Sequence, residues 1–377
     1  MEKNKKAIFI SPVNVFDSKG NGGSKASLEH LNMLIRFVGI ENVMIILFPS
    51  EEVKIPDSLY NIHIIRKTRN KLLLLIASIF GCRAYMPWEE KNILKIISDF
   101  RPDFIFFDYS IEGRLVKKCK NYKSIVFFHN IEADYSYDRM KNIGWYLLPS
   151  YLAAKQNDKW ASRYASRVFC FNKRDSERLQ IRYSRKADVC IPVSFVDSFE
   201  EKKDYSKQKE LLFLGSCFGP NLDGIVWFAK EVMPCLPEIS LYIVGKGFEN
   251  VRSQFENYEN INVIGTVDKP SEYYYKYPTV VMPIRYGSGM KVKTAEAMMY
   301  GCHIFASDEA LEGYDVNGVK GIERCNSKED YVNRIKQYFL DDTKGFEPEV
   351  RQLFLTKYST DSVFELFVSE CESLLSM

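Results

Sequence analysis

Two patterns of apolar and polar positions alternate along the chain. Short runs rich in β-branched and aromatic residues are typical of buried strands, and longer segments with apolar residues three or four positions apart are typical of amphipathic helices. In the first half, the short runs predict strands at 6–13, 42–49, 104–109, 124–130, 168–172 and 187–194. The segments between them predict helices at 25–38, 88–99 and 110–119.

The same alternation starts again in the second half. Strands are predicted at 211–216, 241–247, 261–267, 279–283 and 303–307, with helices near 222–233 and at 362–375. Because strands alternate with helices, we expect an α/β fold of two Rossmann-like, doubly wound parallel-sheet domains that face a cleft. Ligands of such sheets bind beyond the carboxyl ends of the strands.

A charged segment that is poor in core residues separates the two halves. The 377 residues and the apolar content of 46% are sufficient for two packed cores. We therefore expect an N-terminal domain at 1–196, a linker at 197–209, a C-terminal domain at 210–355 and a C-terminal helix at 356–377 that could cross back to the first domain.

Cysteine usage and hydropathy narrow the class of protein. Nine cysteines occur without CxxC or Cys/His metal-ligand spacing, so we expect a reduced, cytoplasmic protein without structural zinc. The N-terminus lacks the apolar core of a signal peptide. The longest apolar run, 72–81, is about half the length that spans a membrane. The sequence thus predicts a soluble protein or one bound to a membrane surface.

Charge is distributed unevenly between the halves. Residues 1–190 contain 32 Lys and Arg against 20 Asp and Glu, whereas the whole chain has a net charge of only +3. A basic half suggests an anionic partner, such as a membrane surface or a phosphorylated acceptor, or else a plain solvated surface. No nucleic-acid motif is present, so nucleic acid is not expected as a partner.

Two segments of the first half combine basic or aromatic residues with apolar runs. Residues 67–81 place basic residues before the apolar run, and residues 144–155 contain several aromatic residues. Such segments can hold a protein at the inner face of an anionic membrane. Alternatively, both are ordinary core helices of the first domain.

The stretch 279–301 contains the clearest candidate chemistry. A β-branched strand ends at Pro283, a glycine loop follows, and a helix-forming segment begins. This arrangement offers backbone N–H groups and a positive helix end to a phosphate. Lys291 and Lys293 lie at the same end, where a cation opposes the helix dipole unless an anion binds there.

Other strand ends also bear candidate residues. The loop 15–27 contains several glycines and opens a helix, and Gly215, Ser216 and Lys246 follow two strands of the second half. His129 ends the apolar strand 124–130, where either a structural role or a role at the cleft is consistent with its position. The remaining histidines, which we expect to be structural, are His30, His63 and His303.

These segments resemble the retaining glycosyltransferases of family 4, the glycosyl transferases group 1, which have the GT-B fold. The stretch GSGMKVKTAEAMMYGCHIFAS resembles their donor-binding signature, in a subgroup with GSG-x-K-x-K before the EAM helix. The segments GSCFGPNLDGIVWFAKEVMP, LYIVGKG and INVIGTVDKPSEYYYKYPTVVMP match the same domain in the right order. In the first half, NGGS and FFHN match the acceptor-side loop and histidine of the family.

The resemblance implies a role for each matching residue. Glu296 corresponds to the glutamate that binds the nucleotide ribose, and His129 to the catalytic histidine that contacts the transferred sugar. Gly265 and Val267 fall where the backbone binds the base, with Gly215, Ser216 and Lys246 on neighbouring loops. The implied diphosphate-binding residues are Ser288, Gly289, Lys291, Lys293, Gly22 and Gly23.

One departure from the family concerns sugar recognition. Ser288 stands where the common pattern has a second glutamate, which contacts sugar hydroxyls. The Arg and Lys often found after the first strand of the second domain are also missing from GSCFGPN, and Lys291 and Lys293 would supply that charge instead.

The resemblance implies an enzyme, a hexosyl- or glycosyltransferase that moves a sugar from a nucleotide-diphosphate sugar to a glycan, lipid-linked or other hydroxyl acceptor. Retention of configuration and a place in surface polysaccharide or glycoconjugate synthesis are further implications. The chain has no DxD metal site, and we expect no cofactor and no metal. Two alternatives remain open, a nucleotide-sugar epimerase of the same fold and a catalytically silent binding partner.

Overall fold

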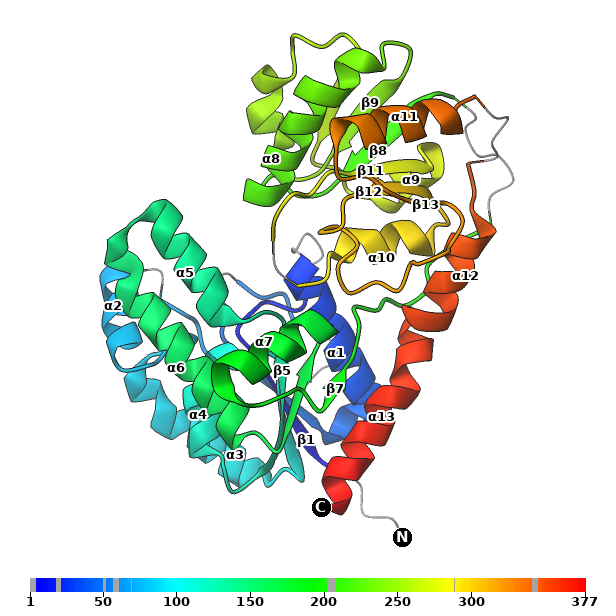
Figure 1. The fold of residues 1–377 in the computed structure, drawn as a ribbon. Helices are drawn as coiled ribbons and strands as arrows, with labels where there is room; N and C mark the ends of the chain where they lie inside the picture. The colour runs from blue at the N-terminus through cyan, green and yellow to red at the C-terminus, as the bar shows by residue number, and fades with distance from the viewer. Residues whose placement is uncertain are drawn as a thin grey trace. The chain divides into compact units, whose positions relative to one another are not determined.

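The chain forms one parallel sheet in each of two units (Figure 1). The first unit comprises Met1–Pro192 and Val363–Met377, and the second comprises Val193–Ser362. The structure is a computed structural model, and it describes residues 5–17, 22–49, 52–56, 61–68, 70–201, 208–287, 289–340 and 345–377.

The first sheet has seven parallel strands in the order β3-β2-β1-β4-β5-β6-β7. Their bounds are β1 Ala7–Ser11, β2 Val43–Leu47, β3 Ile62–Ile64, β4 Phe104–Phe107, β5 Lys123–Phe128, β6 Arg167–Cys170 and β7 Val189–Cys190. Every residue of β1, β2 and β4 is buried, and apart from Ser11 at the end of β1 these strands are continuous apolar runs. The sequence did not predict β3, a short, half-buried edge strand.

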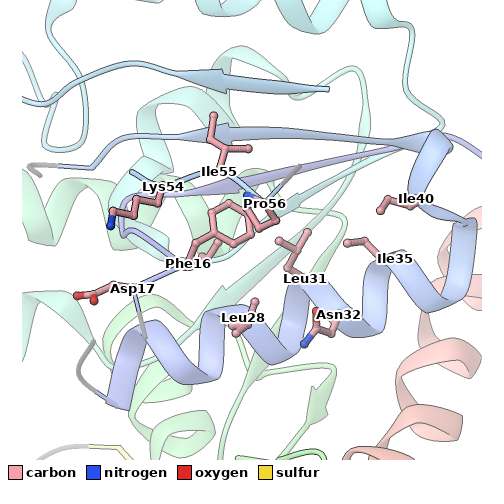
Figure 2. Close-up of a pocket in the computed structure, with 11 residues that line it drawn as sticks. Phe16, Asp17, Leu28, Leu31, Asn32, Ile35, Ile40, Lys54, Ile55 and Pro56 are labelled. Carbon is pink, nitrogen blue, oxygen red and sulfur yellow. The ribbon is translucent and has the colours of Figure 1, made fainter. Parts of the chain in front are cut away.

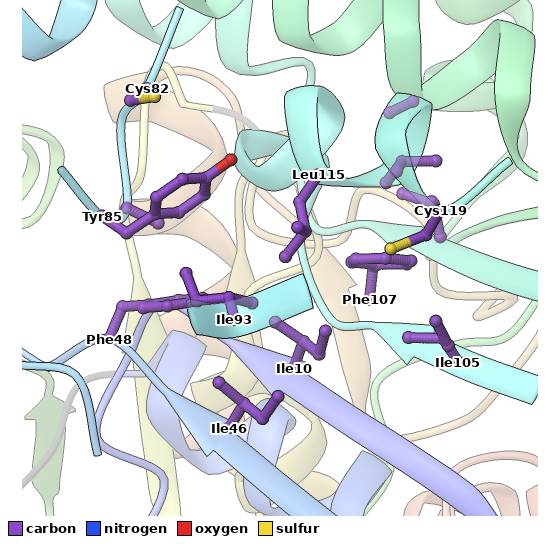
Figure 3. Packing of buried hydrophobic residues seen from close by; sticks show 14 of the residues in the cluster. Ile10, Ile46, Phe48, Cys82, Tyr85, Ile93, Ile105, Phe107, Leu115 and Cys119 are labelled. Atoms are coloured by element: carbon purple, nitrogen blue, oxygen red, sulfur yellow. The ribbon is translucent and has the colours of Figure 1, made fainter. Parts of the chain in front are cut away.

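Helices cover both faces of this sheet, as is usual for parallel strands. Their bounds are α1 Gly22–Val38, α2 Lys71–Ile79, α3 Glu90–Phe100, α4 Gly113–Lys118, α5 Glu132–Ile143, α6 Leu148–Tyr164 and α7 Lys173–Tyr183. In the core, Ile10, Ile46 and Phe107 of the sheet lie in one apolar cluster with Ile93 of α3 and Leu115 of α4 (Figure 3). The run 72–81, one of the two segments considered for a membrane surface, mostly forms α2.

The second sheet has six parallel strands in the order β10-β9-β8-β11-β12-β13. Their bounds are β8 Glu210–Leu214, β9 Ser240–Val244, β10 Ile261–Gly265, β11 Thr279–Met282, β12 His303–Ala306 and β13 Ile322–Arg324. The accompanying helices are α8 Gly219–Trp227, α9 Ser271–Lys276, α10 Val292–Met299, α11 Lys328–Tyr338 and α12 Pro348–Lys357. The helix predicted near 222–233 starts earlier, at Gly219, and changes to a π-helical turn at Phe228–Val232.

In both sheets the strand order reverses at the middle, between β1 and β4 in the first and between β8 and β11 in the second. The predicted α/β fold of two doubly wound parallel sheets is therefore confirmed. Among the described residues, no helix is both long and apolar enough to cross a membrane.

The last helix, α13 (Thr360–Ser376), returns to the first unit, as the sequence suggested. The ring of its Phe364 lies 4.0 Å from the Arg36 guanidinium of α1, and Lys123 donates to the Leu375 carbonyl at 2.6 Å. Phe367 packs against Phe106 of β4. The linker at 197–209 stays a prediction, since its residues 202–207 lie outside the described part of the chain.

Candidate functional site

Four polar residues from different elements meet at the carboxyl edge of the first sheet. Asp108 directly follows β4, Ser11 ends β1, His129 directly follows β5, and His30 lies on α1. One oxygen of Asp108, Oδ1, lies 2.7 Å from His30 Nδ1 and 3.1 Å from His129 Nε2. The other oxygen, Oδ2, accepts a hydrogen bond from Ser11 Oγ at 2.9 Å.

This cluster is almost completely shielded from water. Asp108 is 0% exposed, His30 3% and His129 5%. Burial by itself raises the pKa of the Asp108 carboxyl, but the positive charge that His129 has in its protonated form and the hydrogen bonds from both histidines hold this pKa well below its usual range. Burial lowers the pKa of His30 despite its bond to Asp108. The structure therefore combines an ionised aspartate with a neutral His30.

The histidine cluster contains both a predicted and an unpredicted residue. His129 lies at the sheet edge where its sequence position placed it, and its expected catalytic role stays a prediction. His30 was expected to be merely structural, but its ring reaches Asp108 and lies next to that of His129. His63 lies on edge strand β3, and His303 Nδ1 pairs with Glu347 at 2.7 Å.

The same three side chains have the donor set of a metal site. The ligand atoms of His30, Asp108 and His129 lie within 4.8 Å of one another, and two imidazoles with a carboxylate suit several transition metals. Their direct hydrogen-bond distances are equally those of a metal-free network. The expectation that the protein needs no metal therefore stays a prediction.

The predicted glycine loop at 15–27 ends earlier than expected. Helix α1 begins at Gly22, so Gly22 and Gly23 lie in its first turn and not in a loop. The backbone N–H groups of a first turn have no partner within the helix, so these two glycines remain able to offer them to an anion. Gly20 of the same loop lies outside the described residues.

A buried acidic group that the sequence did not reveal lies close to this edge. Glu112 is 1% exposed, and neither carboxylate oxygen has a hydrogen-bond partner on another described residue. Burial and the nearby charge of Asp108 raise its pKa well above the usual range, so Glu112 is a neutral acid. Nearby, Arg83 pairs with Glu132 at 3.4 Å, and burial lowers the pKa of Lys67 to about 8.

A cavity of about 640 Å³ lies beside α1 in the first unit. Figure 2 shows that apolar side chains of α1, including Leu28 and Leu31, face Phe16 and Ile55 across it. None of the described residues that were predicted for the site lines this cavity.

The loops that follow three strands of the second sheet approach one another closely. Gly215 donates its N–H to Val244 at 3.0 Å, and Gly245 donates to the Gly265 carbonyl at 2.7 Å. Gly245 has a φ of +144°, and a Cβ at this position would lie 1.8 Å from the Gly215 oxygen. Only glycine fits there, and this residue was not identified from the sequence.

Glu249 joins two of these loops. Its Oε2 accepts hydrogen bonds from the backbone N–H groups of Gly247 at 3.1 Å and Thr266 at 3.2 Å, and its Oε1 accepts one from the Thr266 hydroxyl at 2.9 Å. Thr266 lies between Gly265 and Val267, the two residues expected on the base side. Glu249 was not identified from the sequence.

Lys293 meets the loop after β8. Its ammonium donates to Asn221 Oδ1, and the Asn221 amide in turn donates to the Ser216 carbonyl at 2.7 Å. The ammonium also lies 4.9 Å from the centre of the Phe213 ring. Burial, together with the charge of Lys291, lowers the pKa of Lys293 to about 7 although Glu296 acts in the opposite direction. Among the described residues, no carboxylate forms a salt bridge with Lys293.

Lys291 has a different environment. Its ammonium pairs with Glu309 at 2.6 Å and donates to the Gly289 carbonyl at 2.9 Å. Glu309 belongs to the loop after β12 and also lines a cavity of about 310 Å³ with Trp227 and Arg285. Gly289 has a φ of +64°, as a tight loop requires, and the predicted diphosphate ligand Ser288 lies outside the described residues.

The remaining predicted residues lie at the same edge of the second sheet. Glu296 is half-buried in the second turn of α10, Val267 is half-buried after β10, and Lys246 is exposed after β9. The carbonyl of Lys246 accepts from the N–H of Cys217 at 2.8 Å. The structure thus places Gly215, Ser216, Lys246, Gly265, Lys293 and Glu296 on neighbouring segments of one unit.

Comparison with known proteins identifies a domain in this unit. Residues 208–341 match the family model of the glycosyl transferases group 1. The chain is 23% identical to the O-antigen biosynthesis glycosyltransferase WbnH of Escherichia coli over 273 residues, which cover 70% of this chain and 73% of WbnH.

Solved structures match almost the full length of the chain. Sucrose-phosphate synthase from Thermosynechococcus elongatus matches with a TM-score of 0.74 at 12% identity, over 99% of this chain and 100% of that chain. Anabaena HepE, solved in complex with UDP and glucose, matches with a TM-score of 0.70 at 12% identity, over 98% and 100% of the two chains. This chain therefore has a GT-B fold, and its residues 208–341 are similar to the glycosyl transferases group 1.

Proposed function

We propose that this protein is a retaining glycosyltransferase that moves a sugar from a nucleotide-diphosphate sugar to a hydroxyl group of a glycan or lipid-linked acceptor. The observation that most supports it is the Lys293 ammonium, which lies at the start of α10 and is held by a neutral amide. A cation in that position, beside the first turn of a helix, is suited to a diphosphate.

The proposed chemistry needs stabilisation of the leaving group. Cleavage of the glycosyl–phosphate bond leaves negative charge on the nucleoside diphosphate, and preorganised N–H groups and cations that face this charge lower the barrier. Lys293, Lys291 and the N–H groups at the start of α10 would supply it, and Glu296 one turn later would bind the ribose. In this proposal no metal ion is required.

Related proteins support the choice of substrates. WbnH is named as an O-antigen biosynthesis glycosyltransferase, and HepE was solved with UDP and glucose. We infer that this protein uses a nucleotide sugar and acts in surface polysaccharide or glycoconjugate synthesis at the cytoplasmic side of the membrane. The resemblance implies a sugar-binding glutamate where this chain has Ser288, so the screen below compares donors with different sugars.

A thermal-shift screen tests the proposal directly. The full chain is heated with UDP-, GDP-, ADP- and TDP-sugars, because a ligand that binds only the folded state raises the melting temperature. Stabilisation by sugars of one base, followed by transfer to an acceptor, supports a glycosyltransferase. Stabilisation without any turnover would indicate a silent binding protein instead.

Lys293→Ala is expected to weaken binding of the nucleotide sugar and to remove its pH dependence. A bound diphosphate favours the charged ammonium, so binding takes up a proton at a pH above the Lys293 pKa of about 7. Affinity of the native protein should therefore be constant below pH 7 and fall by about tenfold per pH unit above it. Calorimetry at pH 6, 7, 8 and 9 measures this, and an unchanged affinity in the variant would contradict the diphosphate assignment.

Glu249→Ala is expected to loosen the loop after β10, because the Gly247 and Thr266 N–H groups lose their acceptor. Amide exchange at both positions should become faster, and nucleotide-sugar affinity should fall. Glu256→Ala, an exposed glutamate without these contacts, is the matched control. If nucleotide affinity stays the same while exchange accelerates, this loop does not bind the base.

His129→Ala is expected to abolish sugar transfer and to leave nucleotide-sugar binding intact, because His129 is proposed to contact the transferred sugar. Activity and calorimetry on the same preparation separate the two effects. His63→Ala, on the half-buried edge strand β3, is the control for removal of a histidine. Full activity of the His129 variant would return this residue to a structural role.

The surface of α2, α5 and α6 supports the further proposal of contact with an anionic membrane. Helix α2 packs against α6, so the two segments 67–81 and 144–155 lie in one region of the first unit (Figure 1). Trp145 is 72% exposed, Tyr146 64% and Ile79 68%, which is unusual for core helices. Between residues 61 and 88 the sequence has five basic and no acidic residues, which suits an anionic leaflet.

The double change Trp145→Ser, Tyr146→Ser is expected to reduce binding of the full chain to phosphatidylglycerol vesicles several-fold. The apolar anchors are lost while the basic residues remain. Ile181→Ser removes an 82% exposed apolar residue of α7 and serves as the control. Co-sedimentation at low and high salt measures the effect. Binding that is equal for phosphatidylcholine vesicles and insensitive to salt would contradict the proposal.

A further inference from the structure

The hydrogen-bond chemistry of Asp108 restricts the protonation of both histidines. An ionised carboxylate has lone pairs and no proton, so it can only accept hydrogen bonds. Its Oδ1 lies 2.7 Å from His30 Nδ1 and 3.1 Å from His129 Nε2. Each of these nitrogens must therefore bear a hydrogen, or a buried pair of acceptors would face each other.

Contacts with aromatic rings hold the His129 imidazole in this orientation. The Tyr109 ring stacks on it with centroids 3.8 Å apart and planes inclined by 12°. The rings of Phe127 and Phe171 approach it edge-on, at 5.3 Å and 5.1 Å. With Asp108 at one nitrogen and these rings around the plane, rotation of the imidazole would break several contacts at once.

We propose that Asp108 is a positioning residue that fixes His129 as its Nε2–H tautomer, so that Nδ1 is the nitrogen that accepts a hydrogen bond from substrate. The substrate group must then be a donor, and a sugar hydroxyl has the right chemistry. This inference rests on the proposed function for the identity of the substrate, but not for the tautomer.

The second histidine strengthens the arrangement. His30 donates to the same oxygen, and its ring is held against Phe127 at 4.1 Å. Ser11 donates to the other oxygen, Oδ2, at 2.9 Å. The fully buried Asp108 carboxylate therefore accepts three hydrogen bonds. These bonds offset much of the cost of burying its charge. The carboxylate cannot turn away from His129 without losing the other two bonds.

Nitrogen NMR of the native protein tests the tautomer without any assay of activity. The chain has only four histidines, so protein labelled with ¹⁵N-histidine gives a spectrum that single His→Gln variants can assign. At pH 8, with a chelator present to remove metal, we expect His129 Nε2 to be protonated and Nδ1 to be unprotonated. A protonated Nδ1, in either the other tautomer or the imidazolium, would overturn the proposal.

Two substitutions at Asp108 separate hydrogen-bond acceptance from charge. In Asp108→Asn, the amide oxygen can face both histidines while the amide nitrogen donates to the Ser11 hydroxyl. Asp108→Leu is of similar size but has no acceptor. We expect the asparagine variant to keep the tautomer and to lose at most about tenfold in kcat, and the leucine variant to lose about 100-fold with its nucleotide-sugar affinity unchanged.

Equal losses of kcat in both variants would overturn the proposal. They would mean that His129 requires the negative charge of Asp108 and not its ability to accept a hydrogen bond. Ser11→Ala, which removes only the bond to Oδ2, should leave the tautomer unchanged. Should Asp108→Leu fail to fold, the native and asparagine spectra still decide the question. If no nucleotide sugar is bound or transferred, the proposed function fails, whereas the spectrum tests the tautomer independently.

Discussion

Parallel strands place all their carboxyl ends at one edge of a sheet, and this constraint determines where the polar residues of each unit can meet. Neighbouring strands lie about 4.8 Å apart, so residues that follow adjacent strands are within reach of one another. Ser11 ends β1, and Asp108 and His129 directly follow β4 and β5. These three strands are adjacent in the first sheet although they are far apart in the sequence. The glycines after β8, β9 and β10 are brought together in the second sheet in the same way. Strand order, and not any local motif, therefore assembles both clusters.

The charged groups at the carboxyl edges of the two sheets are compensated in different ways. The Asp108 carboxylate receives three hydrogen bonds from the protein itself, so it stays ionised in the absence of a ligand. The Lys293 ammonium is bonded to a neutral amide, and burial lowers its pKa to about 7. The Lys293 side chain is half-buried, and a poorly solvated cation without an anion is costly, so a diphosphate would reduce that cost. The first edge is thus complete in the free protein, whereas at the second edge the Lys293 ammonium is bonded to a neutral amide and not to a carboxylate.

The sequence predicted those features that depend on local pattern. Strands buried on both faces appear as continuous apolar runs, but β3 and β13, which have three residues each and are incompletely buried, give no such signal. The position of His129 at a sheet edge follows from the apolar run before it. His30 is different, because a histidine within a helix gives no indication that its ring reaches a strand end 78 positions later. The roles of Asn221 and Glu249 likewise depend on contacts between loops that only the folded chain brings together.

The two lysines of the opening turn of α10 are not equivalent, and the difference bears on the missing glutamate. Lys291 is already paired with Glu309, so part of its attraction for an anion is used within the protein. Glu309 lies on the loop after β12, and it brings a carboxylate to a loop that has Ser288 where the family has its glutamate. An anion that binds Lys291 would weaken the bond between Lys291 and Glu309. Sugar hydroxyls are hydrogen-bond donors, and a carboxylate can accept hydrogen bonds from them. A carboxylate supplied from a neighbouring strand end would then compensate for one lost within the motif, which is the same dependence on strand order that assembles the cluster around Asp108.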